Sequence, residues 1–447
     1  FRAFTTRASE LGQNPEQDNT QVMQDIMRLR QESAELLGYA NYAEVSLASK
    51  MADSTDKVIS FLRDLAVKSK PFAEQEYAEV VRFAKDELGM TETVQVWDIA
   101  YISEKMREQQ FQFTEQDLKP YFPVDRVIEG LFKLVGQLYN IKITPAKQAV
   151  DLWHDDVQFY QIHNQAGELC AEFYLDLYAR QHKRGGAWMS DFCGRFKRTQ
   201  GVQTPVAFMT CNSSPPIGDQ PALFTHDEVV TLFHEFGHGL HHMITQVDYP
   251  DVSGIRGVEW DAVELPSQFM ENWCWEREVL DMISGHWETG EALPQSLFEK
   301  MQAARHFQSA MGMVRQLEFG LFDMLLHIDS AASEEGRLAS ILQSVRDEVA
   351  VIKQPSFNRM VNSFSHIFAG GYAAGYYSYK WAEVLSADAY ARFEEDGLFD
   401  AETGQAFLNE VLQVGGSRPA MESFVAFRGR EPTIDALLRH SGLSEAA

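Results

Sequence analysis

The sequence is organised around five residues that read His234-Glu235-Phe236-Gly237-His238. On an α-helix, positions i and i+4 lie on the same face about one turn apart, so the two histidines can point at one spot. Neutral imidazole is a good zinc ligand, and two rings at this spacing supply two corners of a tetrahedral site. A glutamate between them can take a proton from a water beside the metal. The motif therefore predicts a catalytic zinc site, and not merely an amphipathic helix with scattered histidines.

The sequence around the motif is typical of a helix. Residues 227–228 are acidic and begin the first turn, and the apolar run 229–233 follows. His241 and His242 come directly after the motif, and His238 and His242 are again spaced i, i+4. Because glycine follows His238, this shifted pair would have no base beside it. We therefore expect His241 and His242 to lie behind the metal ligands or at the surface.

A third metal ligand should come from a neighbouring element, since a catalytic zinc site usually has three protein ligands and a water. Residues 261–276 predict a second helix that is kinked near Pro266. It carries Asp261, Glu264 and Glu271, and this spacing can place all three carboxylates on one helical face. Spacing alone leaves the choice among the three open.

Length, charge and cysteine content limit the possible classes of protein. The chain has 447 residues, enough for two or three average domains or one large two-lobed enzyme. Its formal net charge of −26 argues against nucleic acid as a partner, because phosphate binding needs a basic face. The four cysteines form no C-x-x-C pair, so we expect free thiols in a reducing compartment. No apolar stretch approaches the roughly eighteen residues of a membrane span.

The chain starts with residues 1–4, which read Phe-Arg-Ala-Phe. This start is neither a signal peptide nor an initiator methionine. We expect that the numbering begins after a lost segment or that the chain is a fragment.

Apolar residues recur at helical spacing through most of the first 140 residues and predict a helical scaffold. The pattern continues with helices within 291–352. The individual helices of the scaffold are expected at 17–37, 56–88, 97–109 and 124–139.

The pattern changes near residue 155, where strands are expected at 158–163, 168–178 and 206–211. A basic segment at 180–186 contains glycine but lacks the pattern of a phosphate-binding loop. A small sheet therefore precedes the metal helix. One of its strands could pair with an extended peptide backbone, although a purely structural role is the commoner case.

A glycine pair at 370–371 precedes four tyrosines. Tyr372, Tyr376 and Tyr379 fall at i, i+4 and i+7 and would share one helical face, whereas Tyr377 would not. An aromatic stripe of this kind is often packing. Glycines beside phenol donors also suit a mobile segment that offers hydrogen bonds to a substrate, and spacing alone does not decide between the two.

These residues resemble the thimet oligopeptidase family of zinc peptidases. The similar segments are the metal helix at 233–242, the glutamate segment at 260–273, the tyrosine segment and the tail at 427–432, and the resemblance extends to about residue 442. It implies one zinc ion per chain, bound by His234, His238 and Glu264.

The resemblance also implies the fold. We expect a mainly α, two-lobed, zincin-type metallopeptidase with a deep central channel and a small antiparallel sheet beside the active-site helix. One catalytic region would span 1–447, with a helical scaffold at 1–150, the small sheet at 151–215 and a helical zinc-binding and substrate-binding part at 216–447. Family members carry a further domain-sized segment before the point where this chain begins, and it forms part of the channel wall.

The remaining roles follow from the motif and the resemblance together. Glu235 would act as general base and then as proton donor to the leaving amine. Asp261 and Glu271 would orient a ligand histidine by accepting its second ring proton, or one or both would be solvated carboxylates at the surface. The resemblance assigns catalytic positions to His366 and Tyr379 and substrate-binding positions to the other two tyrosines of the stripe, Tyr372 and Tyr376.

The expected activity is cytoplasmic endoproteolysis of short peptides by a monomer, with no nucleic-acid or membrane partner. An alternative is a dipeptidyl carboxypeptidase of the same fold, although residues 270–276 resemble the oligopeptidases more. A third possibility is a truncated peptide-binding module without activity. The presence of His234, Glu235, His238 and Glu264 argues against this third possibility.

Overall fold

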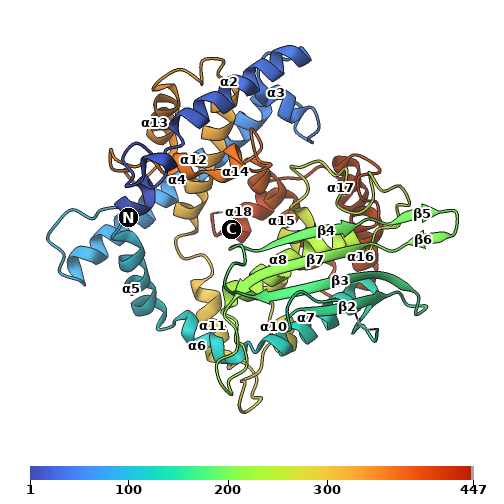
Figure 1. The fold of residues 1–447 in the computed structure, drawn as a ribbon. Helices are drawn as coiled ribbons and strands as arrows, with labels where there is room; N and C mark the ends of the chain where they lie inside the picture. The colour runs from blue at the N-terminus through green and yellow to red at the C-terminus, as the bar shows by residue number, and fades with distance from the viewer. Residues whose placement is uncertain (149, 444–447) are drawn as a thin grey trace. The chain divides into compact units, whose positions relative to one another are not determined.

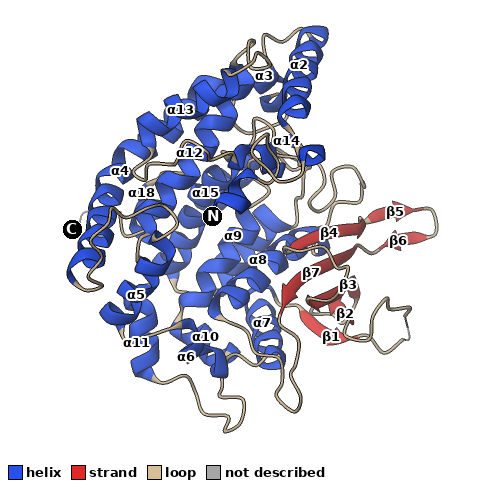
Figure 2. Ribbon diagram, turned by 60° about the vertical axis from the view of Figure 1, so that its left-hand side comes forward, coloured by secondary structure: helices blue, strands red, loops and turns tan. Residues whose placement is uncertain are grey.

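A computed structural model describes residues 1–148 and 150–443 (Figure 1). The chain consists of two compact units. Unit 1 contains Phe1–Gln110, His306–Trp381 and the described chain from Leu438 on, and unit 2 contains Phe111–Arg305 and Ala382–Leu437. Helices dominate both units, and every described strand belongs to unit 2 (Figure 2). The expected mainly helical fold with a small sheet is confirmed. The expected channel stays a prediction.

The regular elements in the described part of unit 1 are all helices, and the most extensive packing between them joins α4 and α12. Leu62 and Leu65 of α4 are fully buried. Gly320 of α12 lets the two helices approach, because a Cβ there would already lie 3.3 Å from the Leu62 methyl groups. The elements are α1 (Arg2–Thr6), η1 (Pro15–Gln17), α2 (Thr20–Leu37), α3 (Tyr42–Leu47), α4 (Thr55–Asp86), α5 (Ile99–Phe111), α12 (Ser309–Ile328), α13 (Arg337–Val349), η4 (Met360–Ser363), α14 (Ser365–Phe368) and the start of α15 (Ser378–Asp396).

The predicted scaffold helices correspond to α2, α4 and α5 in unit 1 and to α7 (Val124–Tyr139) in unit 2. Their ends follow local chemistry. Gly38, for example, takes up a left-handed conformation with φ of 84° and closes α2.

The sheet of unit 2 has five strands in the order β1-β2-β3-β7-β4. The expected antiparallel sheet is wrong in one pairing: β3 and β7 run parallel, whereas the other three neighbouring pairs are antiparallel. The reason is that β4 and a separate β5–β6 hairpin intervene in the chain, so β7 returns beside β3 in the same direction. The strands are β1 (Lys142–Pro145), β2 (Gln158–His163), β3 (Leu169–Tyr178), β4 (Trp188–Cys193), β5 (Phe196–Arg198), β6 (Gly201–Gln203) and β7 (Val206–Ser213).

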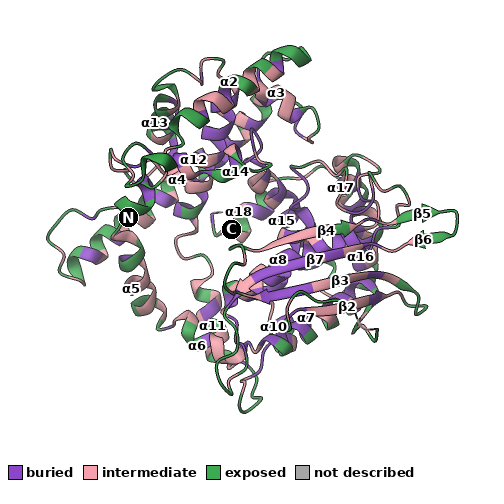
Figure 3. Cartoon of the chain, viewed as in Figure 1, coloured by how far each residue is buried: buried purple, intermediate pink, exposed green. Residues whose placement is uncertain are grey.

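The helix that carries the histidine motif, α8 (His226–Met243), packs on the buried strand β7 (Figure 3). Phe236 of the motif faces this layer: its ring centre lies 5.8 Å from Phe173 of β3 and 5.9 Å from Phe132 of α7.

The remaining elements of unit 2 are α6 (Glu115–Leu118), η2 (Lys119–Tyr121), α9 (Leu265–Asn272), η3 (Trp273–Trp275), α10 (Arg277–Ile283), α11 (Gln295–Ala304), α16 (Ala401–Phe407), the π-helical turn η5 (Leu408–Leu412) and α17 (Ala420–Arg428). The last helix, α18 (Asp435–His440), crosses the unit boundary.

The expected helix over 261–276 is shorter than predicted. It begins only at Leu265, with Glu264 as the residue before the first turn and Pro266 inside that turn. Proline is well tolerated there because its missing N–H would have no partner in the helix. Asp261 and Glu264 therefore lie in the turns before α9, and the three carboxylates do not share one helical face.

Candidate metal centre

The start of α8 is fixed by a reciprocal pair of hydrogen bonds. The Glu228 backbone N–H donates to Thr225 Oγ1 (3.2 Å), and the Thr225 backbone N–H donates to Glu228 Oε2 (2.8 Å). This capping box satisfies two N–H groups that the first turn leaves free. It places His234 and His238 two and three turns further along a helix whose start is defined.

Gly237 allows α8 and α9 to approach very closely. A Cβ atom at Gly237 would lie 2.4 Å from the Pro266 carbonyl oxygen and 2.6 Å from Ser267 Cα. Both are backbone atoms that cannot turn aside as a flexible side chain can. The start of α9 therefore lies directly against the motif, and Glu264 is brought beside the two histidines.

The three predicted ligands meet at one point. His234, His238 and Glu264 each offer one atom to a group whose members all lie within 4.8 Å of one another. Glu264 Oε2 is 3.0 Å from His238 Nε2 and 3.3 Å from His234 Nε2. Two imidazole nitrogens and one carboxylate oxygen are a donor set typical of catalytic zinc, so the residues fit the ion.

Glu271 fixes the orientation of His234, the first predicted ligand. Its Oε1 lies 2.6 Å from His234 Nδ1, which directs His234 Nε2 toward Glu264. Burial alone would lower the pKa of His234, but Glu264 and Glu271 on either side raise it to about 10. The two carboxylates thus favour a positive charge at this ring. A metal cation can supply that charge in place of the proton.

Glu264 itself is buried and held in place. Ser267 Oγ donates to Glu264 Oε2 at 2.9 Å. Burial would raise the pKa of the Glu264 carboxyl, but His238 and His234 outweigh burial and hold that pKa well below its ordinary value. The carboxylate is therefore ionised and can act as a ligand. Asp261 is fully buried as well, and its predicted role toward a ligand histidine stays a prediction.

Glu235 is buried beside the predicted ligands. Burial raises the pKa of the Glu235 carboxyl, although His234 and His238 oppose this shift, as does the nearby backbone of Met189 on β4. The edge strand of the sheet therefore lies beside the predicted base.

His241 and His242 are both buried, so a surface position is wrong for either. His242 Nε2 lies 3.0 Å from the Cys193 carbonyl oxygen, which ties the helix to the end of β4. Burial lowers the pKa of His241 to about 3, so its ring is neutral at neutral pH. Among the described residues, the only group with metal-ligand spacing contains neither ring.

Three features of this site were not predicted from the sequence, namely the close approach at Gly237, the Ser267 hydroxyl and the position of Met189 beside Glu235. A glycine inside the motif was a visible signal for the first, since glycine in a helix interior costs stability unless packing requires it. Nothing in the sequence pointed to the other two.

The tyrosine segment belongs to unit 1, whereas the three ligands and Glu235 belong to unit 2. The expected helical stripe is wrong, because residues 369–377 form turns between α14 and α15. The turns nevertheless gather three tyrosines, with the Tyr379 ring 4.6 Å from Tyr372 and 5.2 Å from Tyr376. The exposed His366 lies 6.4 Å from Tyr379 between ring centres. Tyr377 is buried and packs on Trp381 instead.

Tyr376 differs from the other two members of the cluster. Its hydroxyl donates to Gln316 Oε1 at 2.9 Å, and burial raises its pKa to about 12. This phenol is already engaged inside unit 1, which fits packing better than contact with a substrate.

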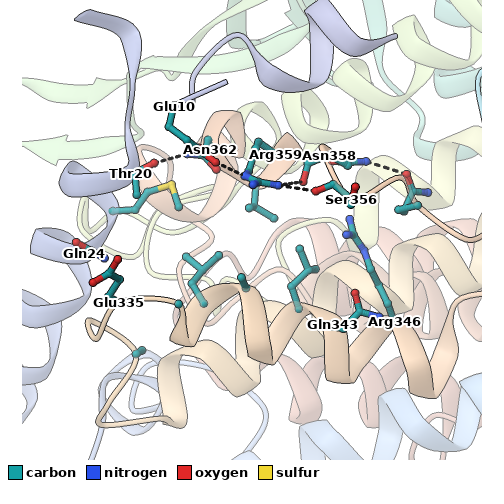
Figure 4. Close-up of a pocket in the computed structure, with 18 of the residues that line it drawn as sticks. Glu10, Thr20, Gln24, Glu335, Gln343, Arg346, Ser356, Asn358, Arg359 and Asn362 are labelled. Atoms are coloured by element: carbon teal, nitrogen blue, oxygen red, sulfur yellow. Dashed lines mark hydrogen bonds and ion pairs between the residues drawn. The ribbon is translucent and has the colours of Figure 1, made fainter. Parts of the chain in front are cut away.

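A cavity of about 600 Å³ also lies in unit 1, but it contains none of the predicted site residues (Figure 4). Its polar wall is internally paired: Arg359 Nε donates to Glu10 at 2.7 Å, and Asn362 Nδ2 donates to Thr20 Oγ1 at 3.0 Å. We assign it no role.

Residues 1–443, which are nearly the whole chain, match Peptidase family M3. This chain belongs to Peptidase family M3. The resemblance noted from the sequence is therefore confirmed. Within the described residues, no helix is both long and apolar enough to cross a membrane.

The family M3 proteins that are similar to this chain include proteins named oligopeptidase A and dipeptidyl carboxypeptidase. The chain is 55% identical over 445 residues to the oligopeptidase A of Haemophilus influenzae and 53% identical over 445 residues to that of Escherichia coli. Each alignment covers 99% of this chain and 65% of the relative, so the chain spans less than two thirds of their length. The dipeptidyl carboxypeptidase of Escherichia coli is 33% identical over 447 residues, covering 99% of this chain and 64% of that protein.

Solved structures share the fold at low sequence identity. The chain matches a structure of PZ peptidase A with an inhibitor at a TM-score of 0.60 and 15% identity, covering 96% of this chain and 64% of that one. It matches the M32 carboxypeptidase of Deinococcus radiodurans at a TM-score of 0.53 and 13% identity, covering 94% and 74%.

The close approach of α8 and α9 predicts that Gly237→Ala weakens both the fold and the metal site. A methyl group must push the α9 backbone away, and overpacking of this kind costs about 1–3 kcal/mol. Because Glu264 stands at the start of α9, zinc affinity should fall together with the melting temperature.

Gly239→Ala on the same helix is the matched control. Its added methyl meets only the flexible ends of Met209 and Met243, at 3.0 and 3.2 Å. Zinc titration and thermal unfolding of both variants check the account. Equal losses in the two variants would contradict it.

The contact between Glu271 and His234 predicts that Glu271→Gln keeps the fold but weakens zinc binding about 10- to 100-fold. The amide can no longer hold the Nδ1 proton as a carboxylate does. Competition with a fluorescent chelator measures the affinity, and an unchanged value would show that the contact does not support the ligand.

Proposed function

We propose that this chain is the catalytic part of a zinc-dependent endopeptidase that hydrolyses short oligopeptides. The observation that carries the proposal is the convergence of His234, His238 and Glu264 beside the buried carboxylate of Glu235. Membership of Peptidase family M3 and the names of the similar proteins support the same reaction.

A bound zinc ion would polarise a water molecule and the carbonyl of the scissile peptide bond. Glu235 takes the proton of that water and then gives it to the leaving amine. Its raised pKa brings the carboxyl closer to the working pH, which favours both transfers.

Tyr379 is our choice for the donor that stabilises the negative oxygen of the tetrahedral intermediate. A phenol stays protonated at neutral pH and carries its donor at the end of a stiff ring. Tyr372, which stacks on Tyr379, positions the substrate together with His366. Tyr376 contributes mainly by packing, since its hydroxyl is bound to Gln316.

The endopeptidase is favoured over the dipeptidyl carboxypeptidase because the chain is more similar to the oligopeptidases A. A module without activity is disfavoured, because the ligands and the base are arranged for chemistry. We further propose a cytoplasmic monomer. Four free cysteines suit a reducing compartment.

The test of the proposed function is Glu235→Gln. Glutamine keeps the shape of the side chain but cannot accept the proton, so turnover of a mixed peptide pool should fall by about 10²–10⁴-fold. Zinc content should stay near one per chain. Mass spectrometry of the pool measures cleavage, with and without a chelator.

Glu228→Gln provides a matched control on the same helix, because glutamine can also serve in the capping box. Its turnover should equal that of the wild type. Near-normal turnover in Glu235→Gln, or cleavage that survives removal of the metal, would contradict the proposed function.

A comparison of Tyr→Phe variants tests the tyrosine roles. Tyr379→Phe should lower turnover about 10²–10³-fold with little change in melting temperature, because it removes one oxyanion donor. Tyr377→Phe should leave turnover unchanged, since Tyr377 is buried against Trp381. If each loss of turnover merely follows a lower melting temperature, the segment is packing.

A further inference from the structure

A single buried carboxylate holds the turn that carries the tyrosine cluster. Asp323 on α12 is fully buried. Its Oδ1 accepts the backbone N–H of Ala374 at 2.9 Å, and its Oδ2 accepts those of Gly375 and Tyr376 at 2.8 and 2.9 Å. Three consecutive N–H groups therefore converge on one side chain about fifty residues away in the sequence.

The turn needs such support because of its backbone conformation. Ala374 has φ of 47°, a left-handed conformation that non-glycine residues adopt only at a cost. The opposite side of the turn is held as well: Ser46 Oγ donates to the carbonyl oxygens of Ala373 and Ala374, at 2.9 and 3.0 Å. Asp323 therefore holds the backbone N–H groups of this turn, and Ser46 holds its carbonyl oxygens.

A second layer of contacts orients Asp323. His327, one turn further along α12, has its Nε2 at 2.9 Å from Arg30 Nη1. A guanidinium can only donate, so His327 Nε2 accepts and its Nδ1 carries the proton. That Nδ1–H points at Asp323, lying 3.0 Å from Oδ1 and 2.8 Å from the backbone oxygen. The result is a chain of contacts from Arg30 through His327 to the tyrosine turn.

We propose that Asp323 is a positioning residue for catalysis, acting through the turn at 374–376 to hold Tyr372 and Tyr379 in their stacked arrangement. The inference rests on the proposed function of these tyrosines. It extends that function to a fully buried carboxylate to which we assign no direct part in the reaction. The turn lies between the two tyrosines in the sequence, so a shift of its backbone moves one ring relative to the other.

Only a carboxylate satisfies this turn. Both oxygens of Asp323 accept from N–H groups, and an asparagine would set its own NH₂ group against one of those donors. Asp323→Asn thus leaves at least one buried N–H without a partner. The variant should loosen the turn without removing any group that we assign to the reaction.

The first measurement is hydrogen exchange together with turnover. In Asp323→Asn, the amides of residues 374–376 should exchange faster. Turnover of a peptide substrate should fall about 10- to 100-fold well below the melting temperature, as expected for a small misplacement of catalytic groups.

Glu76→Gln is the matched control. Glu76 is another unit 1 carboxylate that accepts two backbone N–H groups of α12, those of Ala310 and Met311, at 3.2 and 2.8 Å. This change should lower stability and leave turnover near that of the wild type. An equal loss of turnover in both variants would reduce Asp323 to a structural role.

The decisive measurement is a double-mutant cycle with Tyr379→Phe. If Asp323 acts through the tyrosines, Asp323→Asn should cost less than about threefold in the Tyr379→Phe background, because coupled residues are not additive. The same fold loss in both backgrounds would overturn the inference. Should Asp323→Asn fail to fold, Ser46→Ala loosens the other side of the turn and is expected to show the same dependence on Tyr379.

Different outcomes test the proposed role of Tyr379 and the positioning role of Asp323. Full turnover in Tyr379→Phe would contradict the proposed role of the tyrosine. Full turnover in Asp323→Asn with fast exchange at 374–376 would contradict the positioning role alone.

Discussion

The candidate metal centre depends on one steric constraint, the direct contact between the backbones of α8 and α9 at Gly237. No side chain fits between the helix and the Pro266 carbonyl. The two histidines that we propose as ligands come from one rigid helix, but the third proposed ligand belongs to a different segment. Its carboxylate reaches the histidines only because the two backbones touch. The glycine in the motif is therefore as important to the geometry as the ligands beside it.

The other residues of the motif divide the work between packing and chemistry. Phe236 packs against aromatic rings of the sheet layer, which fixes the rotation of α8 about its axis. His234 then lies between Glu264 and Glu271, and the base that follows it lies beside the backbone of Met189 on the edge strand. His234 is thus held by carboxylates from a different segment, which limits the motion of its ring.

The parts of this site that follow from local spacing could be predicted from the sequence, and the parts that follow from distant contacts could not. The histidine pair needs only the period of a helix. Whether Pro266 kinks a helix or begins one depends on which residues before it are helical, and the sequence pattern suits both. The parallel pairing of β3 and β7 joins strands separated by another strand and a hairpin.

The tyrosine segment shows the same limit. Helical spacing predicted that the three tyrosine rings would lie together. They do lie together, but it is the turns at 369–377, and not a helix, that bring them into contact. The turn is stabilised by Asp323. This residue lies so far from the turn in the sequence that no local pattern could indicate the contact. The family resemblance supplied the identity of the residues, whereas the physical reason for their arrangement required the structure.

We propose that two histidines of α8 and the glutamate before α9 hold a zinc ion. Diffraction from crystals of the zinc-loaded protein, measured on both sides of the zinc absorption edge, locates the ion. One strong anomalous peak is expected at about 2.0–2.2 Å from His234 Nε2, His238 Nε2 and a Glu264 oxygen. A peak held by other residues, or zinc bound without Glu264, would contradict it.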